Sequence, residues 1–138
     1  MVLDSLDDTR ELARQLVAAT SPGSLLLLSG PLGAGKTTLT ACIVRELGSE
    51  AAVSSPTYTL VHEYPTPEGP LVHIDAYRLG HPAALDALGL DDYLDRSRLV
   101  VVEWGEALAH DYPEAWLVRL ERDGETRRVE LQPPKTRE

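Results

Sequence analysis

The residues that most clearly indicate a chemical function are eight in a row, Gly30-Pro-Leu-Gly-Ala-Gly-Lys-Thr37. They fit the pattern G-x-x-x-x-G-K-[ST] without a mismatch. Glycines in such a segment allow backbone conformations that turn successive N–H groups inward, and these groups form a concave anion site. The Lys36 ammonium can reach the β- and γ-phosphates of a nucleotide, and the Thr37 hydroxyl can bind Mg²⁺. The alternative, a glycine turn with an exposed lysine, fits less well because the motif lies between an apolar strand pattern and a helical pattern.

The helix expected to begin near Lys36 would add the positive end of its dipole to this anion site. Backbone and side chains of the loop and of the first helical turn should therefore share the phosphate contacts. The residues expected to bind the nucleotide here are Gly33, Ala34, Gly35, Lys36, Thr37 and Thr38.

A magnesium ion at this loop needs a carboxylate at the end of a neighbouring strand, and two candidates exist. Asp75 follows the apolar segment 71–74, and Glu103 follows the apolar segment 99–102. Each would emerge at the carboxyl edge of the sheet, where ligands bind in open α/β folds, although either could instead cap the next turn. Because the run before Glu103 is more uniformly apolar, we favour Glu103 as the metal ligand and Asp75 as the residue that orients an attacking water.

The segment 54–58, Ser-Ser-Pro-Thr-Tyr, lies between the phosphate motif and the strand that ends at Asp75. In phosphate-loop proteins this interval often holds a loop that senses the γ-phosphate through a hydroxyl group. A strand that begins at a proline kink explains the same residues equally well.

The elements that must position these residues can be read from the hydrophobic pattern. Ser5 resembles the start of a capping box, and apolar residues at helical spacing continue to about Ala19. Gly48 should end the helix that follows the phosphate loop. Asp123-Gly124 is a strong hairpin signal. The remaining predicted elements are strands at 25–28, 71–75 and 99–102, an extended segment at 53–64 that could pair with 71–75, a short helix at 82–88, and hairpin strands at 116–121 and 128–132.

This order of elements predicts an α/β fold in which helices flank a mixed central sheet and a β-hairpin lies near the C-terminus. At 138 residues the chain is expected to form a single domain over residues 1–132, with 133–138 as a frayed tail.

The composition narrows the classes of function. The chain carries 22 acidic and 13 basic side chains, a formal net charge of −9, which argues against a protein that grips nucleic acid by itself. No apolar run approaches the roughly 20 residues needed to span a bilayer, so no membrane association is expected. The single cysteine, Cys42, cannot form an internal disulfide, and a cytoplasmic location is therefore the expectation.

Four motifs occur together and in order: Gly-Pro-Leu-Gly-Ala-Gly-Lys-Thr-Thr at 30–38, Ser-Pro-Thr-Tyr-Thr-Leu at 55–60, His-Ile-Asp-Ala-Tyr-Arg-Leu at 73–79 and Val-Glu-Trp at 102–104. In this combination the chain resembles the bacterial TsaE (YjeE) family, the ATPase component of tRNA threonylcarbamoyladenosine biosynthesis. The resemblance implies a small P-loop NTPase fold that binds ATP or ADP with Mg²⁺ and hydrolyses ATP weakly alone. It also implies partnership with TsaD and TsaB, which modify adenosine 37 of tRNA. This chain would then associate with tRNA only indirectly, through that complex.

The same resemblance assigns roles to further residues. Ser55, Pro56 and Thr57 become a switch-like loop. Thr9 is expected to approach the base, and Arg127 to lie beside the nucleotide, with Arg128 as the competing choice. The chain departs from the family at Pro31, where an acidic residue is commoner, and proline removes one N–H from the first turn of the loop.

Two other functions use the same phosphate motif. A small-molecule kinase would need a lid with arginines, and only the segment 78–98, with Arg78, Arg96 and Arg98, could supply one. A nucleotide-dependent interaction module would dock to a partner in its ATP-bound form without needing turnover.

Overall fold

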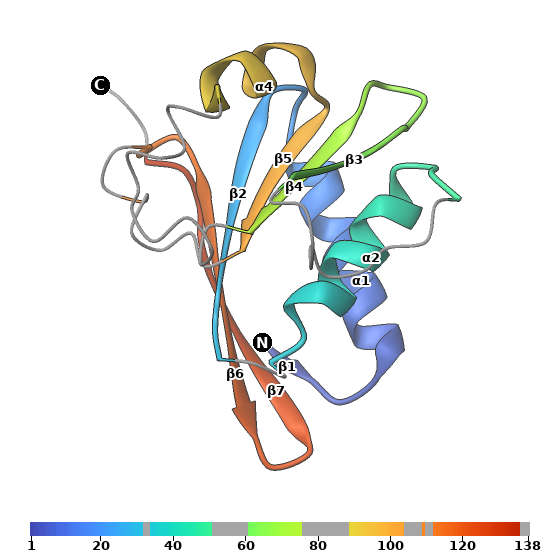
Figure 1. Cartoon of the computed structure of the whole chain (residues 1–138). Coiled ribbons are helices and arrows are strands. Elements are labelled where there is room, and N and C mark those ends of the chain that lie inside the picture. Colours follow the sequence, from blue (N-terminus) through green and yellow to red (C-terminus); the bar gives the residue numbers. More distant parts are fainter. Residues whose placement is uncertain (32–33, 51–60, 76–88, 104–108, 110–111, 136–138) are drawn as a thin grey trace.

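The computed structural model describes residues 1–31, 34–50, 61–75, 89–103, 109 and 112–135. Within these residues one sheet of seven strands runs through the molecule in the order β1-β7-β6-β2-β5-β4-β3 (Figure 1). The strands are β1 (Val2–Leu3), β2 (Ser24–Ser29), β3 (Val61–Tyr64), β4 (Leu71–Asp75), β5 (Leu99–Glu103), β6 (Trp116–Asp123) and β7 (Thr126–Gln132). The described helices are α1 (Leu6–Ala19), α2 (Lys36–Glu46) and α4 (Leu90–Arg96).

The centre of the sheet is parallel and its edges are antiparallel. Strand β2 pairs in parallel with β5 and β6, and β5 pairs in parallel with β4. The outer pairs β3–β4, β6–β7 and β1–β7 are antiparallel. The carboxyl ends of β2, β4 and β5 therefore meet at one edge, where ligands bind in sheets of this kind. This arrangement confirms the predicted α/β class, the mixed sheet, the C-terminal hairpin and the pairing of 61–64 with 71–75. Residues 53–60 of the predicted extended segment and the predicted helix at 82–88 lie outside the described residues.

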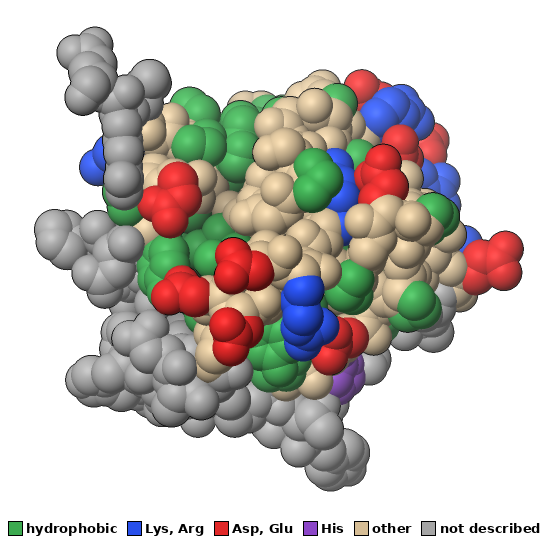
Figure 2. All heavy atoms as spheres, turned by 90° about the horizontal axis from the view of Figure 1, so that it is seen from above, with side chains coloured by type: hydrophobic (Ala, Val, Ile, Leu, Met, Phe, Trp, Pro, Cys, Tyr) green, Lys and Arg blue, Asp and Glu red, His purple; other side chains and the backbone are tan. Residues whose placement is uncertain are grey.

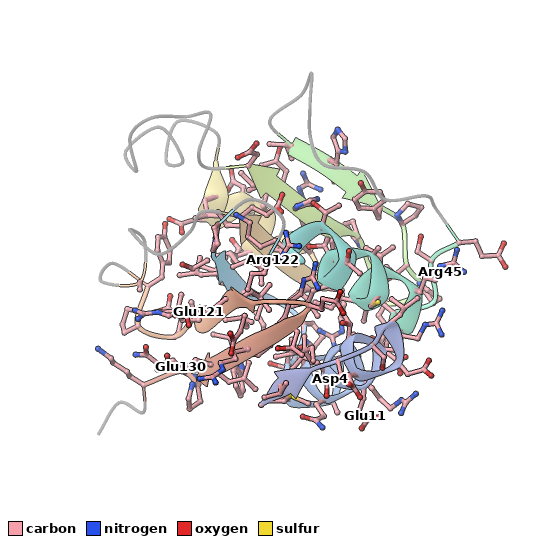
Figure 3. The ribbon with its side chains drawn as sticks, turned by 90° about the horizontal axis from the view of Figure 1, so that it is seen from below. Asp4, Glu11, Arg45, Glu121, Arg122 and Glu130 are labelled. Atoms are coloured by element: carbon pink, nitrogen blue, oxygen red, sulfur yellow. The ribbon has the colours of Figure 1, made fainter. Side chains whose placement is uncertain are left out.

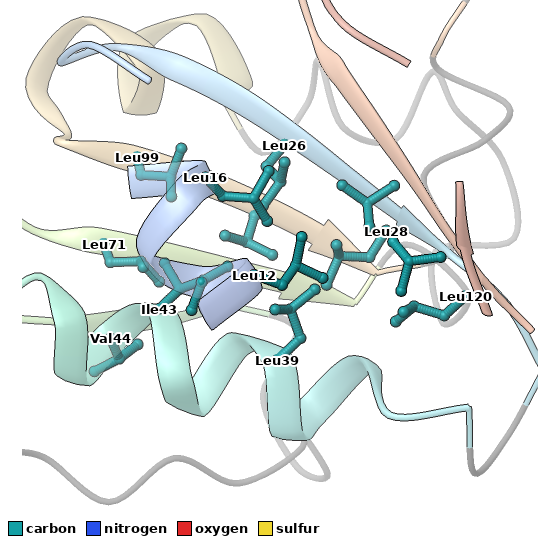
Figure 4. Packing of buried hydrophobic residues seen from close by; sticks show 14 of the residues in the cluster. Leu12, Leu16, Leu26, Leu28, Leu39, Ile43, Val44, Leu71, Leu99 and Leu120 are labelled. Atoms are coloured by element: carbon teal, nitrogen blue, oxygen red, sulfur yellow. The ribbon is translucent and has the colours of Figure 1, made fainter. Parts of the chain in front are cut away.

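Helices α1 and α2 cover one face of the sheet, and their leucines fill the larger core (Figure 4). Leu12 and Leu16 of α1 and Leu39 of α2 meet Leu26 and Leu28 of β2 there, and all are almost fully buried. Burial of each such side chain contributes roughly 1.5–3 kcal/mol relative to exposure. The packing fixes α2, and with it the phosphate motif, against the carboxyl end of β2.

Helix α4 covers part of the other face, and the sequence did not predict it. Three of its seven residues, Asp91, Asp92 and Asp95, are acidic. The helix nevertheless buries Leu90 completely, and Tyr93 and Leu94 pack against the same core at helical spacing. Its acidic side chains remain outside, and Figure 2 shows acidic side chains gathered on the end of the molecule that carries α4.

The β6–β7 hairpin extends beyond the helices, and its charged side chains include Glu121, Arg122 and Glu130 (Figure 3). The two-residue strand β1 pairs with β7 and was not predicted either. In the segment predicted to be a frayed tail, the Lys135 N–H donates to Pro113 O at 2.9 Å, and 136–138 lie outside the described residues. No helix in the described part of the chain has the length and apolar character needed to cross a membrane.

Candidate functional site

The phosphate motif connects the carboxyl end of β2 to the first turn of α2, as its chemistry requires. Gly30 has a φ of +145°, and a Cβ at this position would lie 2.3 Å from the backbone oxygen of Leu120 on β6. Only glycine therefore fits there. Gly35 forms the N-cap of α2 with a φ of +103° and has no side chain to cap the helix. The first-turn N–H groups thus point toward the loop, where an anion can accept from them.

Lys36 is the first residue of α2 and directly follows the glycine-rich loop. Its side chain is buried, and Nζ donates to the backbone oxygen of Gly30 at 2.5 Å. The ammonium group is thereby held over the segment that precedes it in sequence. Thr37 is half-buried and Thr38 exposed in the same first turn of α2, so the turn presents two hydroxyl groups beside the cation.

The two predicted carboxylates lie on neighbouring strands and on the same face of the sheet. Asp75 of β4 and Glu103 of β5 are register partners, and both are buried. Side chains alternate between faces along a strand, and Ile74 and Val102 belong to the core on the α4 side. Asp75 and Glu103 therefore face the opposite side, where α2 begins.

Glu103 joins α2 to the sheet through both of its carboxylate oxygens. Thr37 Oγ1 donates to Glu103 Oε1 at 3.4 Å, and His73 Nε2 lies 2.9 Å from Glu103 Oε2. The sequence did not predict the contact with His73. The signal that could have found it is the spacing of two residues from Asp75, because residues i and i+2 of a strand share a face.

The donor set at this point suits Mg²⁺. Within the described residues, no three His, Cys, Asp or Glu side chains gather into a site that could hold a metal ion unaided. Mg²⁺ has no need of such a cage, because it keeps several waters and is usually bound through one or two carboxylates and substrate phosphates. The adjacent hydroxyl and carboxylate oxygens of Thr37 and Glu103 are hard donors of the kind that it prefers.

A second feature next to the loop is an open pocket of about 330 Å³ between α1, the phosphate motif and β7. It has both apolar and polar walls, and the residues that line it are Leu3, Asp4, Ser5, Leu6, Thr9, Ala34, Gly35, Thr38 and Arg127. The structure thus brings together Thr9, Ala34, Gly35, Thr38 and Arg127, which come from three distant parts of the sequence. A pocket of this kind beside a phosphate loop can take the nucleoside part of a nucleotide.

The structure places the two competing arginines differently. A Cβ on Gly35 would lie 3.3 Å from Arg127 Cδ, so the Arg127 side chain lies directly against the phosphate motif. Arg128 is 66% exposed and pairs with Asp123 at 3.2 Å, at the turn of the hairpin. Neighbouring residues of a strand point to opposite faces, and only Arg127 reaches the pocket.

Other predicted residues lie elsewhere or outside the described part of the chain. Gly33, Ser55, Pro56, Thr57 and Arg78 are outside it. Arg96 pairs with Glu63 at 2.8 Å, on the outer surface. Arg98 is buried and donates to backbone oxygens of Val17 and Thr20 at the C-terminus of α1. Neither of these two arginines is at the phosphate loop, where a kinase lid would need it.

Comparisons with known proteins agree with one another. The profile of the family described as "Threonylcarbamoyl adenosine biosynthesis protein TsaE" matches residues 3–130. Among curated relatives, the tRNA threonylcarbamoyladenosine biosynthesis protein TsaE of Streptomyces coelicolor is 45% identical over 117 residues, covering 82% of this chain and 78% of that protein. The protein of the same name from Haemophilus influenzae is 39% identical over 113 residues, with coverages of 81% and 72%.

A solved structure has a similar fold. The crystal structure of YdiB from Bacillus subtilis superposes with a TM-score of 0.76 at 28% sequence identity. The superposition covers 98% of this chain and 84% of that one. The likeness therefore extends over nearly the whole chain.

Proposed function

The chain belongs to the TsaE family of threonylcarbamoyl adenosine biosynthesis proteins, and from this premise we propose that it binds and hydrolyses ATP with Mg²⁺ in support of a TsaB–TsaD complex. In this proposal the complex transfers the threonylcarbamoyl group to adenosine 37 of tRNA, and the present chain is not the transferase. The partner proteins hold the RNA, which suits a chain with a net charge of −9.

The observation that carries the proposal is the contact between Thr37 and Glu103. Their oxygens lie 3.4 Å apart although 66 positions separate them in sequence. One of the two residues belongs to the phosphate motif, and the other ends a buried parallel strand. This pairing of a loop hydroxyl with a strand-end carboxylate is how phosphate-loop NTPases hold Mg²⁺.

In the proposed reaction, water attacks the γ-phosphorus of ATP and the bond to the bridging oxygen of ADP breaks. Lys36 lies over the loop and neutralises charge on the β- and γ-phosphates, while the N–H groups of the first turn of α2 donate hydrogen bonds to the phosphate oxygens. Asp75 orients the water, and Thr37 and Glu103 hold the metal. Mg²⁺, when bound, supplies further charge neutralisation and fixes the phosphates in line for attack.

The pocket between α1 and β7 receives the adenosine in this proposal. Leu3 and Leu6 give it apolar walls for a base, and Arg127 lies where it can reach a phosphate or ribose oxygen. Hydrolysis is expected to be weak in the isolated chain. The switch-like residues Ser55, Pro56 and Thr57 are proposed to contact the γ-phosphate when TsaD and TsaB bind.

Phosphate release and nucleotide binding, measured with and without purified TsaB–TsaD, test this function. The chain has two lysines, which gives a matched pair of variants. Lys36→Ala should abolish ATP binding and phosphate release. Lys135→Ala, at an exposed position, should leave both unchanged. Full hydrolysis by the Lys36→Ala protein would overturn the proposal.

Two further measurements separate the other functions. Transfer of a labelled γ-phosphate to a small acceptor, in place of release of free phosphate, would identify a kinase. Many rounds of tRNA modification with a non-hydrolysable ATP analogue would identify an interaction module. Failure to associate with TsaB–TsaD in the presence or absence of ATP would remove the proposed role in tRNA modification.

A further inference from the structure

His73 is a buried polar side chain that the proposed reaction does not yet use. It lies in the middle of β4, two residues before Asp75, and its exposed fraction is 0%. Its Nε2 atom is 2.9 Å from Glu103 Oε2. Its Nδ1 atom has no hydrogen-bond partner among the residues that the structure describes. The ring therefore makes one strong polar contact, and that contact is with Glu103.

The chemistry of the pair sets the direction of this hydrogen bond. A carboxylate only accepts, so the proton of the bond belongs to His73 Nε2. Nδ1 then carries the lone pair in the neutral ring. The other tautomer would place the proton on Nδ1, for which the described residues offer no acceptor, and would direct a lone pair at the Glu103 carboxylate, which is the more costly arrangement.

The consequence for Glu103 is that its two oxygens have separate partners. Oε2 accepts from His73 inside the sheet, and Oε1 accepts from Thr37 at the start of α2. A glutamate at a strand end has several freely rotating side-chain bonds, and a buried donor at one oxygen restricts them. The other oxygen then stays directed at the point where Thr37 and the phosphates would meet the metal.

We propose that His73 is a positioning residue that holds Glu103 Oε1 toward the magnesium site which Glu103 shares with Thr37. The inference rests on the proposed function, because it gives His73 a role only through a metal-binding Glu103. A purely structural role, in which the ring fills space between α2 and the sheet, makes a different prediction. It would be satisfied by any side chain of similar volume.

Three substitutions distinguish positioning from packing. His73→Leu keeps an apolar side chain in the space but removes the donor. His73→Gln places an amide N–H₂ group at about the reach of Nε2, and His73→Asn provides the same group on a shorter side chain. Far-UV circular dichroism and thermal melting identify which variants fold.

The readout is the binding of a fluorescent ADP analogue as the Mg²⁺ concentration is varied, with a parallel titration in EDTA. For His73→Leu, the Mg²⁺ concentration that gives half of the Mg²⁺-dependent increase in nucleotide binding should be about 10- to 100-fold higher than for the wild type, as for other residues that orient metal ligands. Its affinity for the nucleotide in EDTA should stay unchanged. His73→Gln should return the Mg²⁺ requirement to within about threefold of the wild type, and His73→Asn should not.

A double variant tests whether His73 acts through Glu103. In a Glu103→Ala background, the further change His73→Leu should leave the Mg²⁺ requirement unaltered, because residues of one network are not additive. A wild-type Mg²⁺ requirement in folded His73→Leu would overturn the inference, as would equal behaviour of the Gln and Asn variants. If His73→Leu does not fold, the Gln and Asn variants decide alone. A wild-type protein that binds no nucleotide, or binds it without regard to Mg²⁺, would instead signal failure of the proposed function.

Discussion

Asp75 and Glu103 occupy paired positions at the carboxyl ends of two parallel strands, so two carboxylates lie side by side on the face of the sheet that α2 covers. Like charges on neighbouring strands repel each other, and a divalent cation between or beside them relieves this repulsion. The proposal divides the work between them. Glu103, which contacts Thr37, is proposed to bind the metal, and Asp75 is proposed to orient the water.

Glu103→Gln and Asp75→Asn should therefore have different effects. Both should lower phosphate release by about 100-fold or more, the loss typical of a removed catalytic carboxylate. Only Glu103→Gln should raise the Mg²⁺ concentration needed for nucleotide binding, and Asp75→Asn should bind Mg²⁺ and ATP nearly as the wild type does. Parallel titrations of phosphate release and of nucleotide binding measure the two effects. A raised Mg²⁺ requirement in Asp75→Asn alone would show that the roles are reversed.

The two adjacent arginines of β7 provide a matched comparison of nucleotide binding. Arg127 lines the pocket and lies against Gly35, whereas Arg128 pairs with Asp123 at the exposed end of the hairpin. Arg127→Ala should weaken ATP binding about tenfold, equivalent to about 1.4 kcal/mol. Arg128→Ala should change it by less than about twofold, since exposed ion pairs contribute little. Isothermal titration calorimetry at constant salt checks both values, and equal effects would exclude the pocket as the nucleoside site.

Arg98 should be important for stability and not for catalysis. Its guanidinium donates to the backbone oxygens of Val17 and Thr20 and to the Thr20 hydroxyl, and so supplies the positive charge that the last turn of α1 lacks. Arg98→Ala removes the donor to the buried backbone oxygen of Thr20, whereas the backbone oxygen of Val17 keeps the Thr20 N–H and hydroxyl as donors. It should lower the free energy of unfolding by about 2–4 kcal/mol, or the Tm by roughly 10 °C.

Two neighbours of Arg98 serve as controls for this prediction. Glu68, which pairs with Arg98 at 2.9 Å, is 63% exposed, so Glu68→Ala should cost less than about 1 kcal/mol. Arg96→Ala removes an exposed ion pair with Glu63 and the contact of the guanidinium with the Tyr93 ring, 4.6 Å from its centroid, and should lower the Tm much less than Arg98→Ala. An unchanged Tm in Arg98→Ala would show that water satisfies the end of α1 equally well.

Cys42 should react slowly with alkylating reagents at neutral pH. Burial raises the pKa of its thiol, and Arg10 and Arg45 only partly offset this effect through their positive charges. Because the thiolate is the nucleophile, iodoacetamide should modify Cys42 more slowly than an unhindered thiol at pH 7 and markedly faster at pH 9 and above. Mass spectrometry of the intact protein follows the reaction.

The arginines give this alkylation experiment its internal control. Both lie beside Cys42 in the groove between α1 and α2. Arg45→Ala removes a charge that lowers the pKa, so the thiol should be still less ionised and react more slowly at a given pH. Faster alkylation of the variant at pH 7 would mean that access to the groove, and not charge, controls the rate.

Much of the fold follows from local sequence pattern. The short apolar segments predicted strands β2, β4 and β5, and the Asp123-Gly124 turn predicted the β6–β7 hairpin, and the structure contains all of them. Helix α4 was not predicted because it is short and its acidic residues outweigh the helical spacing of Leu90, Tyr93 and Leu94. These three side chains are recognisable as one apolar face only from their contacts with the core. Strand β1 is too short for a periodic signal, and its pairing with β7 is non-local.

Some features of the candidate site can also be predicted from local sequence, and others depend on how the strands pair. The roles of Lys36 and Thr37 can be predicted from motif spacing alone. The contact between His73 and Glu103 depends on the register of β4 against β5, in which His73 pairs with Val101. The choice between Arg127 and Arg128 depends on which face each residue takes in β7, and pairing with β1 and β6 sets this. Register is a tertiary property that the local sequence does not encode.

The pocket between α1 and β7 takes its walls from opposite ends of the sequence. Leu3, Leu6 and Thr9 come from the beginning, and Arg127 lies some 120 positions later, as the register partner of Leu3. A growing chain on the ribosome cannot complete this pocket until β7 has left the exit tunnel and paired with β1. Contacts of such long sequence separation form late. Under the proposed function, the nucleoside part of ATP can then occupy this pocket only after β7 has been synthesised.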